Sequence, residues 1–449
     1  MNEIALPSYV LSAINRLEGN GFSAYAVGGC VRDSILGRNV NDYDVCTSAL
    51  PEETIDVFRD CHVIETGLKH GTVTVRIEHQ PIEITTFRTE GDYSDGRHPD
   101  TVDFTSDIIC DLSRRDFTVN AMAYSPTRGF VDPFNGLKDI KRNIIRTVGD
   151  PKKRFNEDAL RILRALRFAS VLNATIDQET SEAITALRSR LGLISRERIR
   201  EELLKLLCGE GMEGIMMSYS SVICEVIPEL ANAVNYDQNN PHHDHDLYKH
   251  LVLTASNLPK DPILRLAGLI HDIGKPACRS NDEYGISHFY GHAQISAEES
   301  RNIARSLKCS NAEVLRISSV IKFHDGVIEE NEKAVRRRLN QLGPDGVFDL
   351  LDLQRADNLA QKNELPTDRL RHNEVLRKIA HDLIVSNACV STKTLAINGN
   401  DLLARGYKGK QIGKALSILL DAVINGELEN DKDSLLLYLD KKLQLDTLS

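Results

Sequence analysis

The chain has 449 residues, too many for a single hydrophobic core, so we expect roughly two to four domains. Its composition is ordinary for a globular protein, with 41% hydrophobic and 27% charged residues. No apolar run approaches the roughly 20 residues that a membrane helix needs, and we expect neither an export signal nor a membrane partner. The nine cysteines include no Cys-x-x-Cys pair, so we expect reduced thiols in a cytoplasmic protein.

The charge is distributed unevenly. The net charge of -10 argues against a nucleic-acid partner for the chain as a whole. Residues 138–169, however, hold ten Lys and Arg against four Asp and Glu, a local net charge of +6. A basic segment of this kind can bind phosphates even on an acidic protein.

The predicted elements change character along the chain. The first 150 residues contain five strand-like runs, "YAVGG", "DYDVCTS", "TVTVRI", "PIEITTF" and "VDFT". A polar loop, "RTEGDYSDGRHPDTV", precedes the last of them. From about residue 155 the pattern is helical almost to the end, beginning with "NEDALRILRALRFASVL" and "SRERIREELLKLL". These patterns predict an α+β region followed by a long helical region.

Two carboxylates stand two residues apart in the stretch "GGCVRDSILGRNVNDYD". On a strand, Asp42 and Asp44 would project from the same face and repel each other unless a cation lies between them. Carboxylates of this kind hold Mg²⁺ for phosphoryl transfer, and Glu83 in "IEITTF" is a candidate third member of the catalytic set. A solvated acidic turn is the alternative for the pair alone.

The glycine turn before these carboxylates suits a phosphate. Gly28 and Gly29 can expose backbone N–H groups, and Arg32 offers a guanidinium fork. The stretch resembles the head motif of class II nucleotidyltransferases, the family of tRNA CCA-adding enzymes and bacterial poly(A) polymerases. Further family motifs follow in order over roughly residues 20–210: "TGLKHGTVTV", "EITTFR", "RRDFTVNAMAY", "DPFNGLKDI" and "GDPKKRFNEDALRILRALRFA".

The last of these motifs predicts a helix with two faces. Its apolar side chains should pack on the core, while Asp158, Arg161, Arg164 and Arg167 form one ridge of i, i+3 neighbours. A carboxylate accepts from the exocyclic amino group of cytosine or adenine, and a guanidinium donates to the ring nitrogen. The resemblance implies that Asp158 and Arg161 select CTP and ATP in this way. A solvated face with ion pairs is the alternative.

Other assignments are implied by the resemblance. Arg115, Arg164 and Arg167 match family positions that contact the nucleotide, and Asn120 is expected to organise the pocket near the sugar or phosphate. Structural roles are expected for Arg114, Glu197, Arg198 and Glu202. The spelling "GLKHGTVTV" resembles the CCA-adding branch, and residues 89–102 are where a switch between CC and A addition is expected.

A second constellation contains histidine and aspartate. The spacing of His250, His271, Asp272 and Asp357 suits a divalent metal, and "HDIGKP" resembles the HD phosphohydrolase superfamily. His292 and His324 could hold a second metal or a substrate phosphate. Hydrolysis of a phosphomonoester or a 2′,3′-cyclic phosphate at an RNA end would fit. The alternative is an HD fold that has lost activity or serves as a spacer.

Near the C-terminus, "INGNDLLARGYKGKQIGKALSILLDAVINGEL" resembles the tail of bacterial CCA-adding enzymes. Lys408, Lys410 and Lys414 form a basic, glycine-rich entry to a predicted helix, which favours phosphate. We interpret this segment as a grip on the tRNA body, with an ordinary surface turn as the alternative.

The combined hypothesis is a Mg²⁺-dependent enzyme that adds or repairs the 3′-terminal CCA of tRNA from CTP and ATP, acting as a monomer or homodimer. The resemblance implies a polymerase-β-like head with a mixed sheet, followed by an all-α neck, an HD-containing body and a tail. The corresponding ranges are 1–150, 151–235, 236–365 and 366–449. Three alternatives stay open: a poly(A) polymerase or A-only adding enzyme, an RNA-binding HD phosphohydrolase with its own metal, and a non-catalytic RNA-binding protein.

Overall fold

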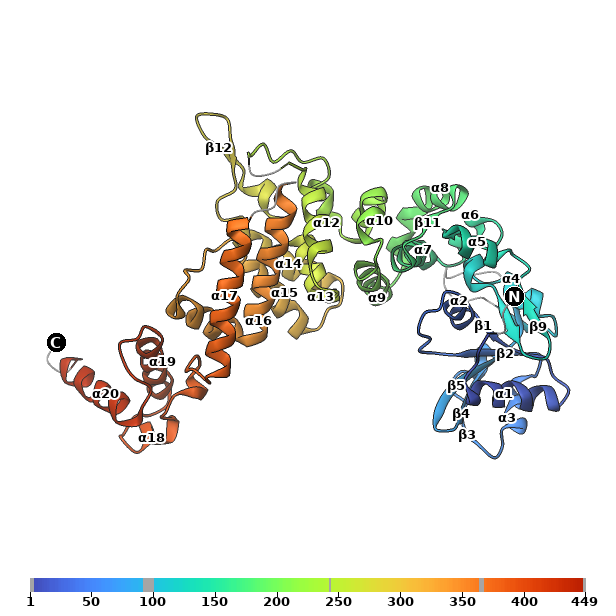
Figure 1. Cartoon of the computed structure of the whole chain (residues 1–449), viewed down its shortest axis with the longest axis horizontal. Coiled ribbons are helices and arrows are strands. Elements are labelled where there is room, and N and C mark those ends of the chain that lie inside the picture. Colours follow the sequence, from blue (N-terminus) through green and yellow to red (C-terminus); the bar gives the residue numbers. More distant parts are fainter. Residues whose placement is uncertain (1–3, 92–100, 242–243, 363–366, 447–449) are drawn as a thin grey trace. The chain divides into compact units, whose positions relative to one another are not determined.

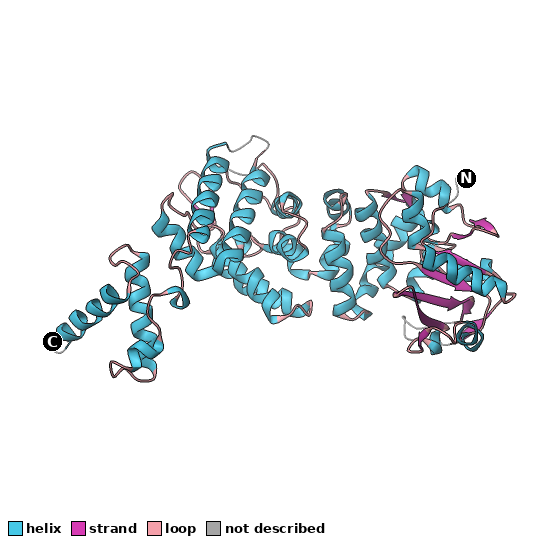
Figure 2. Cartoon of the chain, turned by 60° about the horizontal axis from the view of Figure 1, so that its bottom comes forward, coloured by secondary structure: helices cyan, strands magenta, loops and turns pink. Residues whose placement is uncertain are grey.

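A computed structural model describes residues 4–91, 101–241, 244–362 and 367–446. The chain forms two compact units, Met1–Pro228 and Glu229–Ser449. The larger sheet lies in the first unit, and the second unit is almost entirely helical (Figures 1 and 2). The predicted change from mixed to helical structure is therefore confirmed. Nine residues of the loop expected to switch between CC and A addition, 92–100, lie outside the described residues.

A seven-stranded mixed sheet forms the centre of the first unit, in the order β3-β4-β5-β2-β1-β8-β9. Strands β2 and β5 run parallel, and the other neighbours are antiparallel. The strands are β1 (Ala24–Val27), β2 (Asp44–Thr47), β3 (His62–Ile64), β4 (Thr72–Ile77), β5 (Gln80–Thr86), β8 (Ala123–Ser125) and β9 (Gly129–Val131). Two-stranded pairs are formed by β6 (Arg88–Glu90) with β7 (Val102–Phe104) and by β10 (Ile144–Ile145) with β11 (Thr175–Ile176).

Alternation along the strands creates an apolar cluster on each face of this sheet. In β1, Ala24 and Ala26 belong to one cluster, whereas Tyr25 and Val27 belong to the other. Helix α1 buries its apolar stripe in the first cluster, and Leu112 of α4 packs in the second. The helices of this region are α1 (Ser8–Gly19), α2 (Gly29–Ile35), α3 (Pro51–Val57), α4 (Ile108–Ser113) and α5 (Gly136–Arg142).

The described residues of the first unit form six further helices: α6 (Pro151–Glu157), α7 (Leu160–Leu172), α8 (Gln178–Leu187), α9 (Arg196–Leu207), α10 (Met212–Ser218) and α11 (Ser220–Val226). The predicted apolar face of α7 is buried as expected, because Ile162, Leu163 and Leu166 are fully enclosed. The predicted continuous helix is wrong at Asp158, whose φ and ψ of -141° and 107° separate α6 from α7. The Asp158 carboxylate accepts a hydrogen bond from the Leu160 amide, an arrangement that favours a helix start over a helix interior.

The second unit contains nine helices in its described residues. They are α12 (Leu247–Asn257), α13 (Pro262–Ile270), α14 (His292–Ser306), α15 (Asn311–Phe323), α16 (Glu332–Gln361), α17 (Thr367–Val385), α18 (Gly399–Leu403), α19 (Lys410–Ile424) and α20 (Lys432–Asp446). A hairpin joins β12 (Ser280–Asn281) to β13 (Ser287–His288). Helix α16 is interrupted at Gly343, which has a φ of 72° and precedes Pro344.

Short 3₁₀ helices connect these elements: η1 (Leu68–His70), η2 (Thr118–Asn120), η3 (Arg188–Leu193), η4 (Pro228–Asn232), η5 (Lys275–Cys278) and η6 (Thr392–Thr394). Across the described part of the chain, none of the helices has both the length and the apolarity needed to cross a membrane.

Candidate active site

Two of the three predicted carboxylates, Asp44 and Glu83, lie in the sheet beside the glycine turn. Asp44 opens β2 and pairs in register with Val27, the residue before the turn at Gly28. On its other side, Asp44 pairs in register with Glu83 of β5. Residues paired in this way project from the same face of a sheet, so Asp44 and Glu83 lie side by side, as the sequence led us to expect.

The prediction that Asp42 and Asp44 share one strand is wrong, because β2 begins only at Asp44. Asp42 lies in the exposed segment before the strand, so strand alternation does not orient its side chain. The three carboxylates are also not closely clustered. Among the described residues, the groups of three or more ligand atoms within 4.8 Å of one another do not include Asp42, Asp44 or Glu83.

Negative charge nevertheless predominates around Asp44. The pKa of Asp44 is raised above its usual value by partial desolvation first, although its side chain is exposed, and then by the negative charge of Glu83, with a smaller contribution from Asp42. Nearby Arg115 acts in the opposite direction but does not cancel these effects. Oxygen donors that repel one another fit a hard divalent cation such as Mg²⁺.

The turn at Gly28 favours glycine because of its backbone conformation. Its φ of 80° is rarely adopted by other residues, and a Cβ there would lie 3.0 Å from Nη1 of Arg115. The guanidinium of Arg115 therefore packs directly against the backbone of the turn. Its Nη2 donates to Asp111 at 3.3 Å, while its Nε is buried without a hydrogen-bond partner in the described structure.

The guanidinium of Arg32 is less accessible than the predicted contact with a phosphate would require. Its guanidinium is buried, donates to both carboxylate oxygens of Asp33 at 2.9 and 2.8 Å, and donates to Oδ1 of Asn120 at 2.6 Å. It also lies 5.1 Å from the ring centroid of Phe168. The structure thus brings Arg32 and Asn120 together, and it connects both to the helix that contains Phe168.

Asp116 continues this connection and was not identified from the sequence as a functional residue. Its Oδ1 accepts from Asn120 at 3.2 Å, and its Oδ2 accepts from Nε and Nη2 of Arg164 at 2.8 and 2.6 Å. Burial alone would raise the pKa of Asp116, but the charge and hydrogen bonds of Arg164 outweigh it and lower the pKa to about 2. The "RRDFT" motif contains Asp116, but only the fold reveals its partner.

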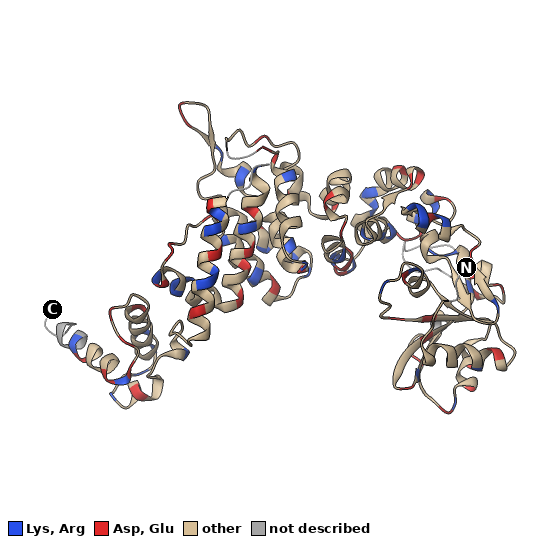
Figure 3. Ribbon diagram, viewed as in Figure 1, with Lys and Arg blue, Asp and Glu red and all other residues tan. Residues whose placement is uncertain are grey.

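The other predicted base-reading side chains also have partners within the chain. Asp158 accepts from Arg198 at 2.8 Å, and Arg161 donates to Glu157 at 2.5 Å. Farther along α7, Arg167 is paired with Glu202. These ion pairs give Arg198 and Glu202 the structural contacts expected of them. Lysine and arginine gather around α6 and α7, consistent with the basic segment of the sequence (Figure 3).

The structure brings the predicted histidine and aspartate ligands together in the second unit. One group consists of His250 on α12, the adjacent His271 and Asp272 that follow α13, and Asp357 on α16, with ligand atoms within 4.8 Å of one another. A second group shares Asp272 and adds His292 and His324. We call these six residues the HD cluster.

The imidazole rings in the HD cluster are oriented by the backbone. The Nδ1 atoms of His271, His292 and His324 lie 2.9, 2.7 and 2.7 Å from carbonyl oxygens of Gly268, Phe289 and Ile321. Each contact directs Nε2 toward the aspartates, as backbone carbonyls do for metal-bound histidines. This is the arrangement expected of a binding site for one or two divalent ions.

Charge attraction dominates the HD cluster. Burial would lower the pKa of His271, but Asp272 outweighs this effect and raises it to about 10. Burial would raise the pKa of Asp272, but His271 and then Lys275 hold it well below its usual range. Lys275, whose Nζ lies 2.6 Å from Asp272, was missed from the sequence although it is part of "HDIGKP".

The three predicted tail lysines flank the start of α19. Lys408, Lys410 and Lys414 are all exposed, and Gly409 precedes the helix with a φ of 53°. In the described structure, none of the three lies in an ion pair, so their charges face solvent.

Comparisons with known proteins agree with this arrangement. Residues 24–146 match the family described as "Poly A polymerase head domain", and residues 280–439 match domain 2 of tRNA nucleotidyltransferases. The chain is 34% identical over 442 residues to the CCA-adding enzyme of Lactobacillus helveticus, a match that covers 97% of this chain and 98% of that one. The chain belongs to the CCA-adding enzyme family.

Other CCA-adding enzymes support the same assignment. The enzyme of Enterococcus faecalis is 32% identical and covers 96% of this chain and 94% of its own length. The crystal structure of the Bacillus stearothermophilus CCA-adding enzyme in complex with CTP aligns with a TM-score of 0.74 at 30% identity and covers 98% of both chains. This CCA-adding enzyme is therefore a tRNA nucleotidyltransferase with a nucleotidyltransferase head, as the sequence motifs predicted.

Proposed function

We propose that this CCA-adding enzyme uses CTP and ATP, with Mg²⁺ held by Asp42 and Asp44 and with Glu83 completing the catalytic carboxylates. The observation that carries the proposal is the strand register. Asp44 pairs with Val27 on one side and with Glu83 on the other, so Asp44 and Glu83 lie beside the glycine turn. The raised pKa of Asp44 also supports the proposal, because a divalent cation would relieve the repulsion between Asp44 and Glu83.

In the reaction, the tRNA 3′ hydroxyl attacks the α-phosphate of the nucleotide and pyrophosphate leaves. Bound Mg²⁺ would stabilise the attacking and leaving oxygens of this in-line transfer. The backbone at Gly28 and Gly29 and the guanidinium of Arg115 position the triphosphate. Since the Nε of Arg115 is buried without a hydrogen-bond partner in the described structure, this residue has donor capacity to offer a phosphate oxygen.

Base selection requires two side chains to exchange partners. Asp158 must release Arg198 and Arg161 must release Glu157 before they can bind a Watson–Crick edge. Cytosine and adenine both present an amino donor beside a ring-nitrogen acceptor, which a carboxylate and a guanidinium complement. Guanine and uracil present the opposite pattern and would leave buried polar groups unpaired.

The test uses tRNA that lacks its CCA end, Mg²⁺ and all four nucleoside triphosphates, of which one is labelled at a time. The proposal predicts two cytidines followed by one adenosine, with no incorporation of GTP or UTP. Addition of A alone would indicate an A-adding enzyme, and long A tails would indicate a poly(A) polymerase. Absence of any extension would contradict nucleotidyl transfer altogether.

A second activity is proposed for the HD cluster, namely metal-dependent hydrolysis of a phosphate ester at an RNA end. The supporting observation is that Nε2 of His271 and Oδ1 of Asp357 are buried 3.6 Å apart and make no well-aligned hydrogen bond within the described structure, although they lie 3.2 Å from the Asp272 carboxylate and the His250 imidazole, respectively. Buried polar atoms without a well-aligned hydrogen bond are unusual, and a metal ion between them would satisfy both.

The hydrolytic proposal is tested by elemental analysis of the purified protein and by assays with RNA ending in a 3′-phosphate or a 2′,3′-cyclic phosphate. Variants His271→Ala and Asp272→Ala should lose both metal and hydrolysis. Unchanged hydrolysis in these variants would show that the HD cluster is not responsible.

A further inference from the structure

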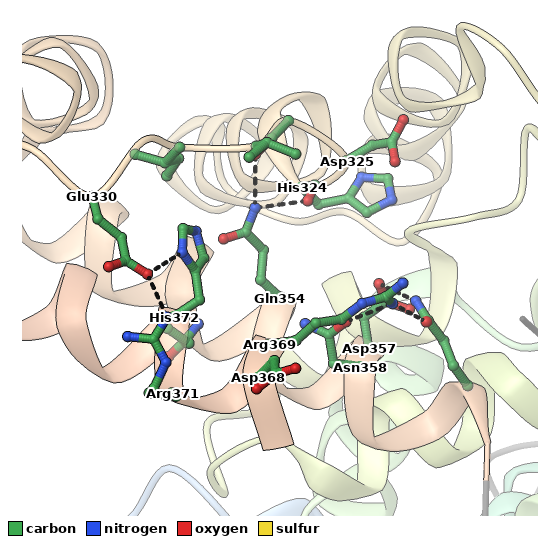
Figure 4. Close-up of a pocket in the computed structure, with 15 residues that line it drawn as sticks. His324, Asp325, Glu330, Gln354, Asp357, Asn358, Asp368, Arg369, Arg371 and His372 are labelled. Carbon is green, nitrogen blue, oxygen red and sulfur yellow. Dashed lines mark hydrogen bonds and ion pairs between the residues drawn. The ribbon is translucent and has the colours of Figure 1, made fainter. Parts of the chain in front are cut away.

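A cavity opens beside the HD cluster, and this inference rests on the hydrolytic activity proposed for that cluster. The cavity has a volume of about 530 Å³ and is lined by His324 and Asp357 of the cluster. Its other wall comes from the first turns of α17, which supply Arg369, Arg371 and His372 (Figure 4). A substrate that reaches Asp357 through this cavity therefore passes these cationic side chains, as well as the carboxylates of Asp325, Glu330 and Asp368.

The cations lining this cavity differ in how their charges are balanced. Arg371 and His372 both contact the carboxylate of Glu330, at 3.4 and 2.8 Å. Arg369 instead donates to two amide oxygens, Oδ1 of Asn358 at 3.1 Å and Oε1 of Gln361 at 2.5 Å. Within the described residues, Arg369 takes part in no ion pair, so its positive charge has no carboxylate partner there.

A hydrogen-bonded chain links this guanidinium to the HD cluster. Gln361 accepts from Arg369 through its Oε1 and donates from its Nε2 to Oδ2 of Asp357 at 3.2 Å. The guanidinium thus stands one amide group away from a residue of the HD cluster. Figure 4 shows Arg369 beside Asp357 and Asn358, whereas Arg371 and His372 lie toward Glu330.

We propose that Arg369 binds the phosphate of the ester that the HD cluster hydrolyses, and so selects anionic phosphate esters. A guanidinium offers two parallel donors that match phosphate oxygens, and its amide partners are neutral groups that an anion can replace at small electrostatic cost. Val327, which is 88% exposed, and the largely buried Ile328 also line the cavity and offer apolar contact to the base of a nucleotide.

The test measures binding of inorganic phosphate, so it does not depend on turnover. Full-length protein loaded with Mn²⁺ is titrated with phosphate by calorimetry, in a background of Asp42→Asn and Asp44→Asn that removes the metal site of the head. The variant Arg369→Ala is compared with Arg369→Lys and with Arg371→Ala, a matched control on the same helix. Manganese content is measured for every protein.

We expect Arg369→Ala to weaken phosphate binding about tenfold or more with unchanged manganese content. Arg369→Lys should recover part of this loss because it keeps the charge, and Arg371→Ala should change binding less than Arg369→Ala. Equal phosphate affinity in Arg369→Ala and the parent protein would overturn the inference. A fall in manganese content would also overturn it, because Arg369 would then act only by holding Gln361 and Asp357.

Hydrolysis of RNA ending in a 3′-phosphate is measured in parallel with the head carboxylates intact. Arg369-dependent phosphate binding without any hydrolysis would contradict the proposed activity, while Arg369 would stand as a phosphate-binding residue. Hydrolysis of the RNA together with phosphate binding that does not depend on Arg369 would support the proposed activity and contradict the inference about Arg369.

Discussion

The carboxylate of Asp116 accepts two hydrogen bonds from the guanidinium of Arg164, joining the segment before η2 to helix α7. Through Asn120 and Arg32, the same carboxylate is connected to helix α2, which begins at the glycine turn. Arg32, expected to bind the triphosphate, and Arg164, expected to contact the nucleotide, are therefore parts of one hydrogen-bonded network.

The first prediction concerns the pH dependence of stability. The pKa of Asp116 is lowered to about 2 in the folded protein, so its ionised form stabilises the fold above the unfolded pKa of 3.8. This contribution, about 2 kcal/mol, should be lost as pH falls from about 4 toward 2. In denaturant unfolding, Asp116→Asn should be less stable than the parent protein at pH 6, and the difference should narrow at pH 3. Asp56→Asn, at an exposed position of α3, is the control. A difference in stability between Asp116→Asn and the parent protein that does not depend on pH would contradict the prediction.

The second prediction concerns the carboxylate of Asp44 beside the glycine turn. Asp44→Asn should lower the rate of CMP addition about a hundredfold or more, because it removes a proposed metal ligand. It should not lower thermal stability, since the pKa of Asp44 is raised by desolvation and by repulsion from Glu83. Glu52→Gln, at an exposed position of α3, serves as the matched charge control. Near-normal CMP addition by Asp44→Asn would exclude a catalytic role for Asp44.

A third prediction separates base choice from catalysis. Arg161→Ala should raise misincorporation of GTP and UTP relative to CTP and ATP by roughly tenfold, since one hydrogen-bonding partner of the base is lost. Single-turnover assays with each nucleotide check this, with exposed Lys153→Ala as the control in the same basic segment. If the variant kept strict C and A addition at the normal ratio, Arg161 would not read the base.

A fourth prediction concerns the HD cluster. His271→Ala should release bound divalent metal while leaving CCA addition within about twofold of the parent rate, because the two proposed activities belong to different units of the chain. Elemental analysis and tRNA extension assays measure the two effects. His381→Ala, at an exposed histidine of α17, should retain both. Unchanged metal content in His271→Ala would contradict the site.

The fifth prediction concerns the tail. Replacing Lys408, Lys410 and Lys414 together by alanine should weaken tRNA binding and reduce the slope of log affinity against log salt by about 2 to 3. The reason is that each lysine in contact with a phosphate releases counterions on binding. Binding measured between 50 and 200 mM salt tests this, and an unchanged slope would show that these lysines make no phosphate contacts.

Local patterns were enough to predict several parts of this protein. β-Branched alternation located β4 and β5, and the 3.6-residue period identified the buried face of α7. The motif strings also located the HD ligands, which the structure brings together. These features are determined by the sequence itself, because periodicity and short motifs depend on residues that are near one another in the chain.

Only the tertiary structure decided the partners of the charged groups. Asp116 meets Arg164 across 48 positions of the chain and Asp158 meets Arg198 across 40, and neither pairing has a local signal. The same holds for Arg369, whose position beside the HD cluster depends on how α16 and α17 pack. Side chains of like charge are interchangeable in a sequence pattern, and only the burial and distances of a fold determine which of them meet.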